Sequence, residues 1–206
     1  REWCSHQRDA PPSGQGSPGV SSRKAACSSA GSAQSDSSAD TQVTDKAPEL
    51  DGRFLIVSAR APNTRAPGSY AWFAVTFTPQ GPVIDAAQAE SSRQTLTRFI
   101  GAACAAYGAD PARVFLLGFS QGAMMSLHVA PRRPVPIAGV VAISGRLLRP
   151  ERLGAEAVVK PPILLVHGDQ DPLVPYHQSI LLVEALQLAS VPVIFYTVAG
   201  GGHGNF

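Results

Sequence analysis

The chain has 206 residues, of which 44% are hydrophobic and 16% charged, and its 17 Lys and Arg against 15 Asp and Glu leave a net charge of +2. That near balance, without a long basic run, argues against a nucleic-acid-binding protein, which needs a basic face to neutralise phosphates. No stretch approaches the ~20 consecutive apolar residues of a membrane-spanning helix, and the three cysteines lack the spacing of a metal site. The first residues show no secretory-signal pattern, so the sequence predicts a cytoplasmic protein.

The composition changes near residue 48. Before it, Trp3, Val20 and Val43 are the only large apolar residues among Ser, Gly, Pro, Ala, Asp and Gln. Such a segment buries too little apolar surface to offset the conformational entropy lost on ordering, so we expect residues 1–47 to be disordered. Residues 48–206 have the composition of a packed domain.

Within this domain, short apolar runs alternate with segments of helical periodicity. The expected strands are 54–59, 113–119, 137–144, 162–168 and 192–200, and the expected helices are 83–108, 122–130 and 175–190. Continuous apolar strands that alternate with helices are typical of a mostly parallel sheet with helices on both faces. The sequence therefore predicts an α/β fold, in which ligands bind at the carboxyl ends of the strands.

A candidate nucleophile follows the strand 113–119. The pattern G-x-S-x-G, from Gly118 through Ser120 to Gly122, comes directly after a predicted strand and opens a predicted helix, as a nucleophile elbow requires. Small residues on both sides allow a strained turn that exposes the serine hydroxyl, and the helix directs its first N–H groups toward developing negative charge. The alternative interpretation is a glycine-rich turn with a helix-capping serine.

A candidate acid and a candidate base follow two later strands. Asp169 and Asp171 both come after the strand 162–168, and we predict Asp171 as the acid and Asp169 as a brace of the turn. His203 follows the last strand and three glycines, which permit a close approach of the backbone. The order Ser120, Asp171, His203 is the one expected for this architecture. His203 would take the proton of Ser120 while Asp171 orients the imidazole.

The other histidines have plainer interpretations. His128 lies on the helix after the elbow and is expected to be packed or half-exposed there. His167 ends a strand, where a hydrogen bond to the backbone is expected, and His177 is expected to be solvated.

Three segments carry a resemblance to a known family. RVFLLGFSQGAMMSL, PPILLVHGDQDPLVP and GGGH resemble the carboxylesterase/phospholipase family of serine α/β-hydrolases, which includes the acyl-protein thioesterases. FLIVSARAP and the GSYAWF after it are also similar to that family, so the resemblance runs from about residue 47 to His203.

The resemblance implies the α/β-hydrolase fold and the hydrolysis of short-to-medium-chain acyl esters, or of thioesters, without a cofactor or metal. By the matching positions, Ser120, Asp171 and His203 would be the catalytic triad, and the backbone N–H of Gln121 would be one oxyanion donor. Trp72 and Leu173 would contact the substrate, with a place in the core as the alternative for Trp72.

Both ends of the chain depart from the family pattern. Family members have an apolar strand and an L-H-G-x-G-like turn, which donates the second oxyanion N–H, ahead of the region that matches FLIVSARAP. We expect residues 1–47 to contain neither. Relatives also continue into a final helix, which residues 204–206 do not provide. Frame errors or truncation in the coding sequence would explain both departures; alternatively, the loop from Arg60 to Tyr70 supplies the second donor.

The sequence thus predicts a carboxylesterase that acts on a small-molecule acyl ester or an acylated substrate. The same three residues would also serve an acyltransferase or a peptidase of this fold, because they determine neither the acceptor nor the leaving group. A catalytically impaired domain or fragment is the alternative outside the enzymes.

Overall fold

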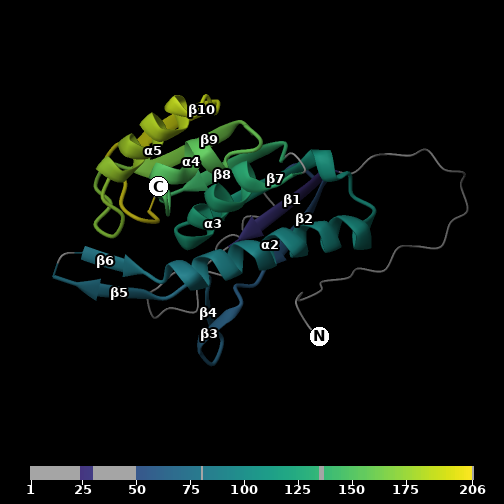
Figure 1. The fold of residues 1–206 in the computed structure, drawn as a ribbon, viewed down its shortest axis with the longest axis horizontal. Helices are drawn as coiled ribbons and strands as arrows, with labels where there is room; N and C mark the ends of the chain where they lie inside the picture. Colours follow the sequence, from purple (N-terminus) through teal and green to yellow (C-terminus); the bar gives the residue numbers. More distant parts are fainter. Residues whose placement is uncertain (1–23, 30–49, 80, 135–136, 206) are drawn as a thin grey trace, which may run out of the picture.

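The computed structural model describes residues 24–29, 50–79, 81–134 and 137–205. Figure 1 shows a twisted sheet with helices packed on it and two short hairpins beside it. The strands are β1 (Lys24–Ser29), β2 (Phe54–Ala59), β3 (Asn63–Ala66), β4 (Ser69–Ala71), β5 (Val75–Thr78), β6 (Gly81–Ile84), β7 (Val114–Phe119), β8 (Gly139–Ile143), β9 (Ile163–Gly168) and β10 (Val193–Val198). The helices are α2 (Ala86–Tyr107), α3 (Gln121–Val129), α4 (Leu153–Glu156) and α5 (His177–Leu188), with short 3-10 turns η2 (Pro111–Arg113), η3 (Ala130–Arg132) and η4 (Pro150–Arg152).

The main sheet has six strands in the order β10-β9-β8-β7-β1-β2. Every neighbouring pair in it is parallel. The five strands expected from the sequence are all present in it, so the predicted parallel α/β architecture is confirmed. All of these strands place their carboxyl ends at one edge of the sheet.

The strand β1 corrects one expectation. Residues 24–29 lie within the segment 1–47 that we expect to be disordered and without a strand, yet they pair with β2 on one side and β7 on the other. Pairing on both sides satisfies the backbone N–H and C=O groups of KAACSS, and this compensates for the lack of an apolar run that would mark a strand in the sequence. The rest of the expected disordered segment, 1–23 and 30–47, lies outside the described residues.

The helix α2 begins later than the sequence predicts. Val83 and Ile84 belong to β6, which pairs with β5 in an antiparallel hairpin, so the helix starts only at Ala86. Asp85 caps it by accepting a hydrogen bond from the N–H of Gln88 at 2.9 Å. At the other end Gly108 adopts the left-handed conformation, which ends the helix where the sequence predicts.

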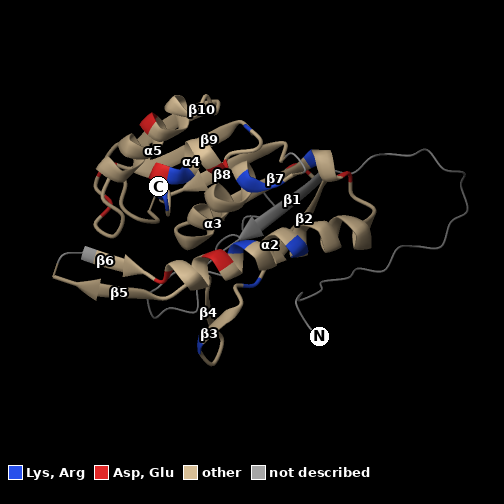
Figure 2. Cartoon of the chain, in the orientation of Figure 1, with Lys and Arg blue, Asp and Glu red and all other residues tan. Residues whose placement is uncertain are grey.

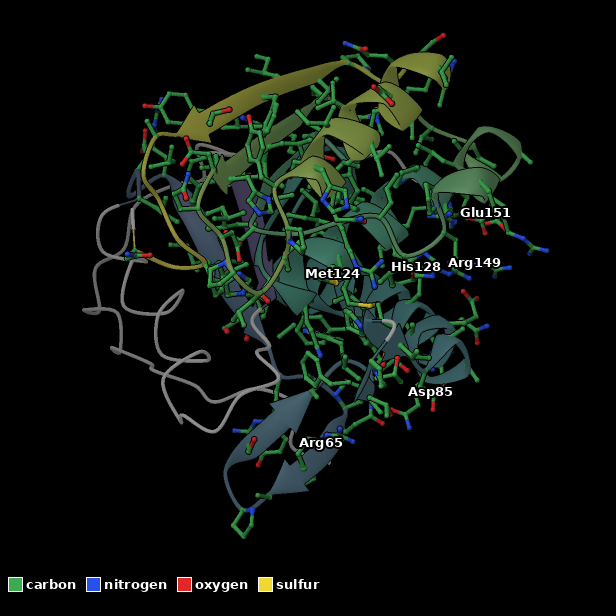
Figure 3. The ribbon with its side chains drawn as sticks, turned by 90° about the vertical axis from the view of Figure 1, so that its left-hand side faces the viewer. Arg65, Asp85, Met124, His128, Arg149 and Glu151 are labelled. Atoms are coloured by element: carbon green, nitrogen blue, oxygen red, sulfur yellow. The ribbon has the colours of Figure 1, made fainter. Side chains whose placement is uncertain are left out.

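The described helices lie on one face of the sheet. α3 packs against β7 and β8, α2 against β2 and α5 against β10 (Figures 1 and 3). Along β7 the side chains alternate between buried and partly buried, and on β10 Ile194 and Tyr196 are exposed. The expected helical cover on both faces is therefore observed on one face within the described ranges.

The distribution of charge and the character of the helices bear on nucleic-acid binding and on membrane-spanning helices. Figure 2 shows Lys and Arg interspersed with Asp and Glu over the described parts of the chain, without a basic stripe. None of the described helices combines the length and the apolar character needed to cross a bilayer.

Candidate active site

Ser120 stands on a strained turn between β7 and α3. Its backbone has φ 52° and ψ −117°, a positive φ that a non-glycine residue rarely adopts. Two hydrogen bonds hold this conformation: the Ser120 N–H donates to the carbonyl of Ile143 at 2.9 Å, and its carbonyl accepts from the N–H of Met124 at 3.0 Å. A Cβ on Gly118 would lie 2.3 Å from the carbonyl oxygen of Gly122, so the turn needs glycine there. The local geometry is that of a nucleophile elbow.

A continuous chain of hydrogen bonds links the three residues predicted as nucleophile, base and acid. His203 Nε2 lies 2.9 Å from Ser120 Oγ, and His203 Nδ1 lies 2.8 Å from Asp171 Oδ2. A carboxylate only accepts, so Nδ1 carries the proton and Nε2 is left to accept from the serine hydroxyl. The imidazole thus has the tautomer that a general base for Ser120 requires.

Asp171 is buried and ionised. Its side chain is 0% exposed, and Oδ1 accepts from the N–H of Leu173 at 2.8 Å and of Val174 at 2.9 Å. Burial alone raises the pKa of Asp171, but the hydrogen bonds from Val174, His203 and Leu173 outweigh it and keep that pKa below its ordinary value. The carboxylate therefore keeps its negative charge facing His203.

Asp169, the competing carboxylate, has a different position. Its Oδ1 accepts from the N–H of Gly200 at 2.8 Å, and this bond braces the turn that leads to His203. The sequence-based distinction between Asp169 and Asp171 therefore agrees with where the structure places them. Gly200 itself has φ 70°, a conformation that favours glycine.

Gln121 connects the elbow to the loop after β4. Its side-chain Oε1 accepts from the N–H of Trp72 at 3.0 Å, and its Nε2 donates to the carbonyl of Phe73 at 3.3 Å. Because Gln121 is the first residue of α3, its backbone N–H belongs to the helix positions that have no partner within the helix. This is the N–H predicted to stabilise an oxyanion, and it follows Ser120 directly.

The two residues predicted to contact substrate differ in exposure. Trp72 is 1% exposed and belongs to the hydrophobic core, which is the alternative that the sequence left open. Its carbonyl is held by Asn63 Nδ2 at 2.9 Å and by the hydroxyl of Ser92. Leu173 is 43% exposed, and its N–H binds Asp171, so it lies next to the hydrogen-bonded residues with its side chain accessible.

The contact between His167 and Asp171 was not predicted from the sequence. The expected backbone hydrogen bond is present, because Nε2 lies 2.9 Å from the carbonyl oxygen of Val174. The same Nε2 also lies 3.1 Å from Asp171 Oδ2, on the carboxylate that His203 contacts. The signal for this contact is the spacing His-x-x-x-Asp, which runs from the end of β9 into the loop after it.

His128, by contrast, lies away from these residues in the helical layer. It is 4% exposed on α3, as the sequence predicts for a packed position, and its Nε2 is 3.5 Å from Glu90 on α2 (Figure 3). Burial is the main cause that lowers the pKa of His128 to about 4, assisted by the positive charge of Arg132. Among the described residues, no cluster of three or more His, Cys, Asp or Glu is arranged to hold a metal ion.

A parallel sheet that presents a serine elbow, an aspartate and a histidine in this order, here after β7, β9 and β10, is typical of the α/β-hydrolase fold. The sequence profile of the phospholipase/carboxylesterase family matches residues 35–205, and the chain belongs to that family.

Curated relatives match over part of their length. A putative esterase, NocK, of Nocardia uniformis subsp. tsuyamanensis is 41% identical over 71 residues, which cover 32% of this chain and 19% of the relative. Acyl-protein thioesterase 1 of Neurospora crassa is 36% identical over 97 residues, covering 44% of this chain and 39% of the relative. The chain thus matches less than half the length of either relative.

Solved structures match over more of the chain. The crystal structure of esterase PE8 superposes with a TM-score of 0.78 at 29% identity, covering 88% of this chain and 85% of that one. Zea mays acyl-protein thioesterase 2 has a TM-score of 0.67 at 21% identity, covering 92% and 90%, and this likeness shows the fold.

Proposed function

We propose that the protein is a serine hydrolase that cleaves short-to-medium-chain carboxylic esters through an acyl-enzyme on Ser120, with thioesters as a second substrate class. The observation that supports this best is the hydrogen-bonded series Ser120–His203–Asp171, which begins at the elbow. Membership of the phospholipase/carboxylesterase family and the likeness to an esterase structure are consistent with the proposal.

The reaction proceeds in two halves. His203 Nε2 takes the proton of Ser120 Oγ as this oxygen attacks the acyl carbonyl, and the resulting imidazolium is stabilised by the ionised Asp171. The tetrahedral intermediate collapses, the bond to the alcohol or thiol breaks, and His203 returns the proton to the leaving group. Water then repeats the sequence on the acyl-enzyme, releasing the carboxylic acid and restoring Ser120.

The negative oxygen of each tetrahedral intermediate needs donors that are already in place. We assign the backbone N–H of Gln121 as one donor, supported by its position at the start of α3, where the helix dipole also favours negative charge. Loss of one donor from such a site costs roughly 10²–10³-fold in rate. The alternative source for the second donor, residues 60–70, includes the antiparallel hairpin of β3 and β4.

The test is hydrolysis of p-nitrophenyl acetate, butyrate, octanoate and laurate by the wild type and by Ser120→Ala, together with covalent labelling by a fluorophosphonate. We expect hydrolysis and labelling by the wild type and loss of both in Ser120→Ala. A folded wild type that neither hydrolyses any ester nor reacts with the fluorophosphonate would overturn the proposal. Capture of the acyl group by an added alcohol in preference to water would instead identify an acyltransferase.

A further inference from the structure

His167 lies behind the Asp171 carboxylate, in a position without solvent. It is the next-to-last residue of β9, and its side chain is 1% exposed. Its Nε2 is 2.9 Å from the carbonyl oxygen of Val174 and 3.1 Å from Asp171 Oδ2, and its Nδ1 is 2.7 Å from Ser179 Oγ on α5. Both ring nitrogens are therefore engaged, and neither contacts Ser120 or His203 directly.

The partners of His167 determine its proton. The Val174 carbonyl and the ionised Asp171 carboxylate can only accept, so Nε2 must carry a hydrogen, which it donates to Val174, while Asp171 Oδ2 lies 3.1 Å from the same nitrogen. In the neutral ring Nδ1 is then an acceptor, and it receives the hydroxyl hydrogen of Ser179. Ser179 is 2% exposed, so this bond is protected from water and holds the ring in one orientation.

As a result, both oxygens of the Asp171 carboxylate have polar contacts. Leu173 and Val174 donate to Oδ1 through their backbone N–H groups, His203 donates to Oδ2, and His167 Nε2 lies 3.1 Å from Oδ2. Rotation of the carboxylate would break bonds at both oxygens in a place where no water replaces them. The positive end of the His167 N–H dipole beside Oδ2 also offsets part of the negative charge on the oxygen that faces His203.

We propose that His167 is a positioning residue of the hydrolase: it holds Asp171 Oδ2 toward His203 and moderates the charge that this oxygen presents to the imidazole. The inference rests on the proposed function, because it concerns how the acid of that site is oriented. Ser179 supports His167 in turn, since its hydroxyl binds His167 Nδ1 and sets the tautomer of the ring. The resulting series of polar contacts runs from Ser120 on the elbow to Ser179 on α5.

The test compares three variants. His167→Leu removes both ring nitrogens, His167→Gln keeps an N–H donor of similar reach, and Ser179→Ala removes only the group that sets the tautomer. Without the polarised N–H beside it, Asp171 Oδ2 presents more negative charge and stabilises the His203 imidazolium more strongly. We therefore expect His167→Leu to lower kcat by roughly 10- to 100-fold, by analogy with the residues that orient metal ligands, and to move the acid limb of kcat/KM to higher pH.

The two more conservative variants should show smaller changes in kcat and in the acid limb than His167→Leu. His167→Gln should recover part of the loss in kcat and part of the shift of the acid limb, and Ser179→Ala should show a smaller change in the same direction. Tyr176 is a further titratable group beside the His167 ring; its ring lies edge-on at 6.1 Å and its hydroxyl is 2.6 Å from Thr197 Oγ1.

A spectroscopic measurement separates this inference from the proposed function. The proton between His203 Nδ1 and Asp171 Oδ2 should give a low-field proton NMR resonance that needs no substrate, and it should move further downfield in His167→Leu. If the wild type hydrolyses no ester, the proposed function fails, while the resonance still tests the inference. An unmoved resonance together with an unmoved acid limb, whether or not the melting temperature falls, would overturn it and leave His167 a structural residue only.

Should His167→Leu fail to fold, Ser179→Ala and His167→Gln decide the question. A resonance and an acid limb identical to those of the wild type in both folded variants would overturn the inference. A graded shift in both would support it.

Discussion

Gly168 and Gly201 lie against each other so closely that a Cβ atom on Gly168 would be 2.2 Å from the carbonyl oxygen of Gly201. The contact joins the end of β9, which leads to Asp171, to the turn after β10, which leads to His203. It is made possible by the absence of a side chain on Gly168. The two loops that hold the proposed acid and the proposed base are thereby brought together by backbone contact.

Replacement of Gly168 should therefore disturb both stability and activity. In Gly168→Ala the added methyl group meets backbone, which has to move, so we expect the free energy of unfolding to fall by about 1–3 kcal/mol and ester hydrolysis to fall with it. Gly154→Ala is the matched control, because nothing lies within 4 Å of the position of its Cβ. Urea unfolding and kcat measured on both variants check this, and equal stability of the two would contradict it.

Replacement of the two neighbouring aspartates, Asp171 and Asp169, should have very different effects on kcat. Asp171→Asn removes the charge that orients and stabilises His203, and by analogy with other serine hydrolases we expect kcat to fall roughly 10⁴-fold. Asp169→Asn keeps an oxygen that accepts from the Gly200 N–H and should leave kcat within a few-fold of the wild type. Steady-state hydrolysis by the two variants is the measurement, and a larger loss in Asp169→Asn would reverse the assignment of the acid.

Stability should decrease between pH 6.5 and pH 4 because of His128. Its pKa is lowered to about 4 from the ordinary 6.5, mainly by burial, so in this window the unfolded chain binds a proton that the folded protein does not. The difference corresponds to about 3 kcal/mol, present above pH 6.5 and lost as the pH falls toward 4.

The measurement is urea unfolding of the wild type and of His128→Gln at pH 7 and pH 5. We expect the wild type to lose more stability than the variant between these two values. The carboxylates do not confound the comparison: the pKa of Glu90 is lowered to about 2, chiefly by its bond to Arg93, and the stability it contributes is lost only below pH 4.5. Equal losses in the two proteins would contradict the prediction.

The side chain of Gln121 should matter separately from its backbone N–H. Gln121→Ala keeps the N–H predicted to bind the oxyanion but leaves the backbone groups of Trp72 and Phe73 without their Gln121 partner, so we expect a loss of about 1–3 kcal/mol in unfolding free energy. Gln121→Glu still accepts from Trp72, but it replaces the donor to Phe73 with a buried carboxylate oxygen, so we expect it to destabilise the protein as well. Thermal unfolding of both variants is the check, and an unchanged Tm in Gln121→Ala would show that the bridge contributes nothing.

The fold was predictable where the signal is local. The strands β2 and β7 to β10 carry apolar runs, and the end of α2 is marked by Gly108, so neighbouring residues suffice to recognise them. β1 has no such run, since KAACSS becomes a strand only through pairing with β2 and β7. The hairpin of β5 and β6 was missed for the same reason, because Val83 and Ile84 fit a helical pattern until their partners on β5 are known.

The sequence by itself determined the order of the functional residues along the chain and the place of each at a strand end. The glycines around Ser120, the loop that contains Asp171 and the three glycines before His203 are local patterns, and local patterns are what a sequence exposes. Only the tertiary structure decided that His167 lies against the Asp171 carboxylate, that its ring binds Ser179 on α5, and that Trp72 is buried. Those contacts join residues from different elements, and their distances depend on how the strands are ordered in the sheet and how the loops pack.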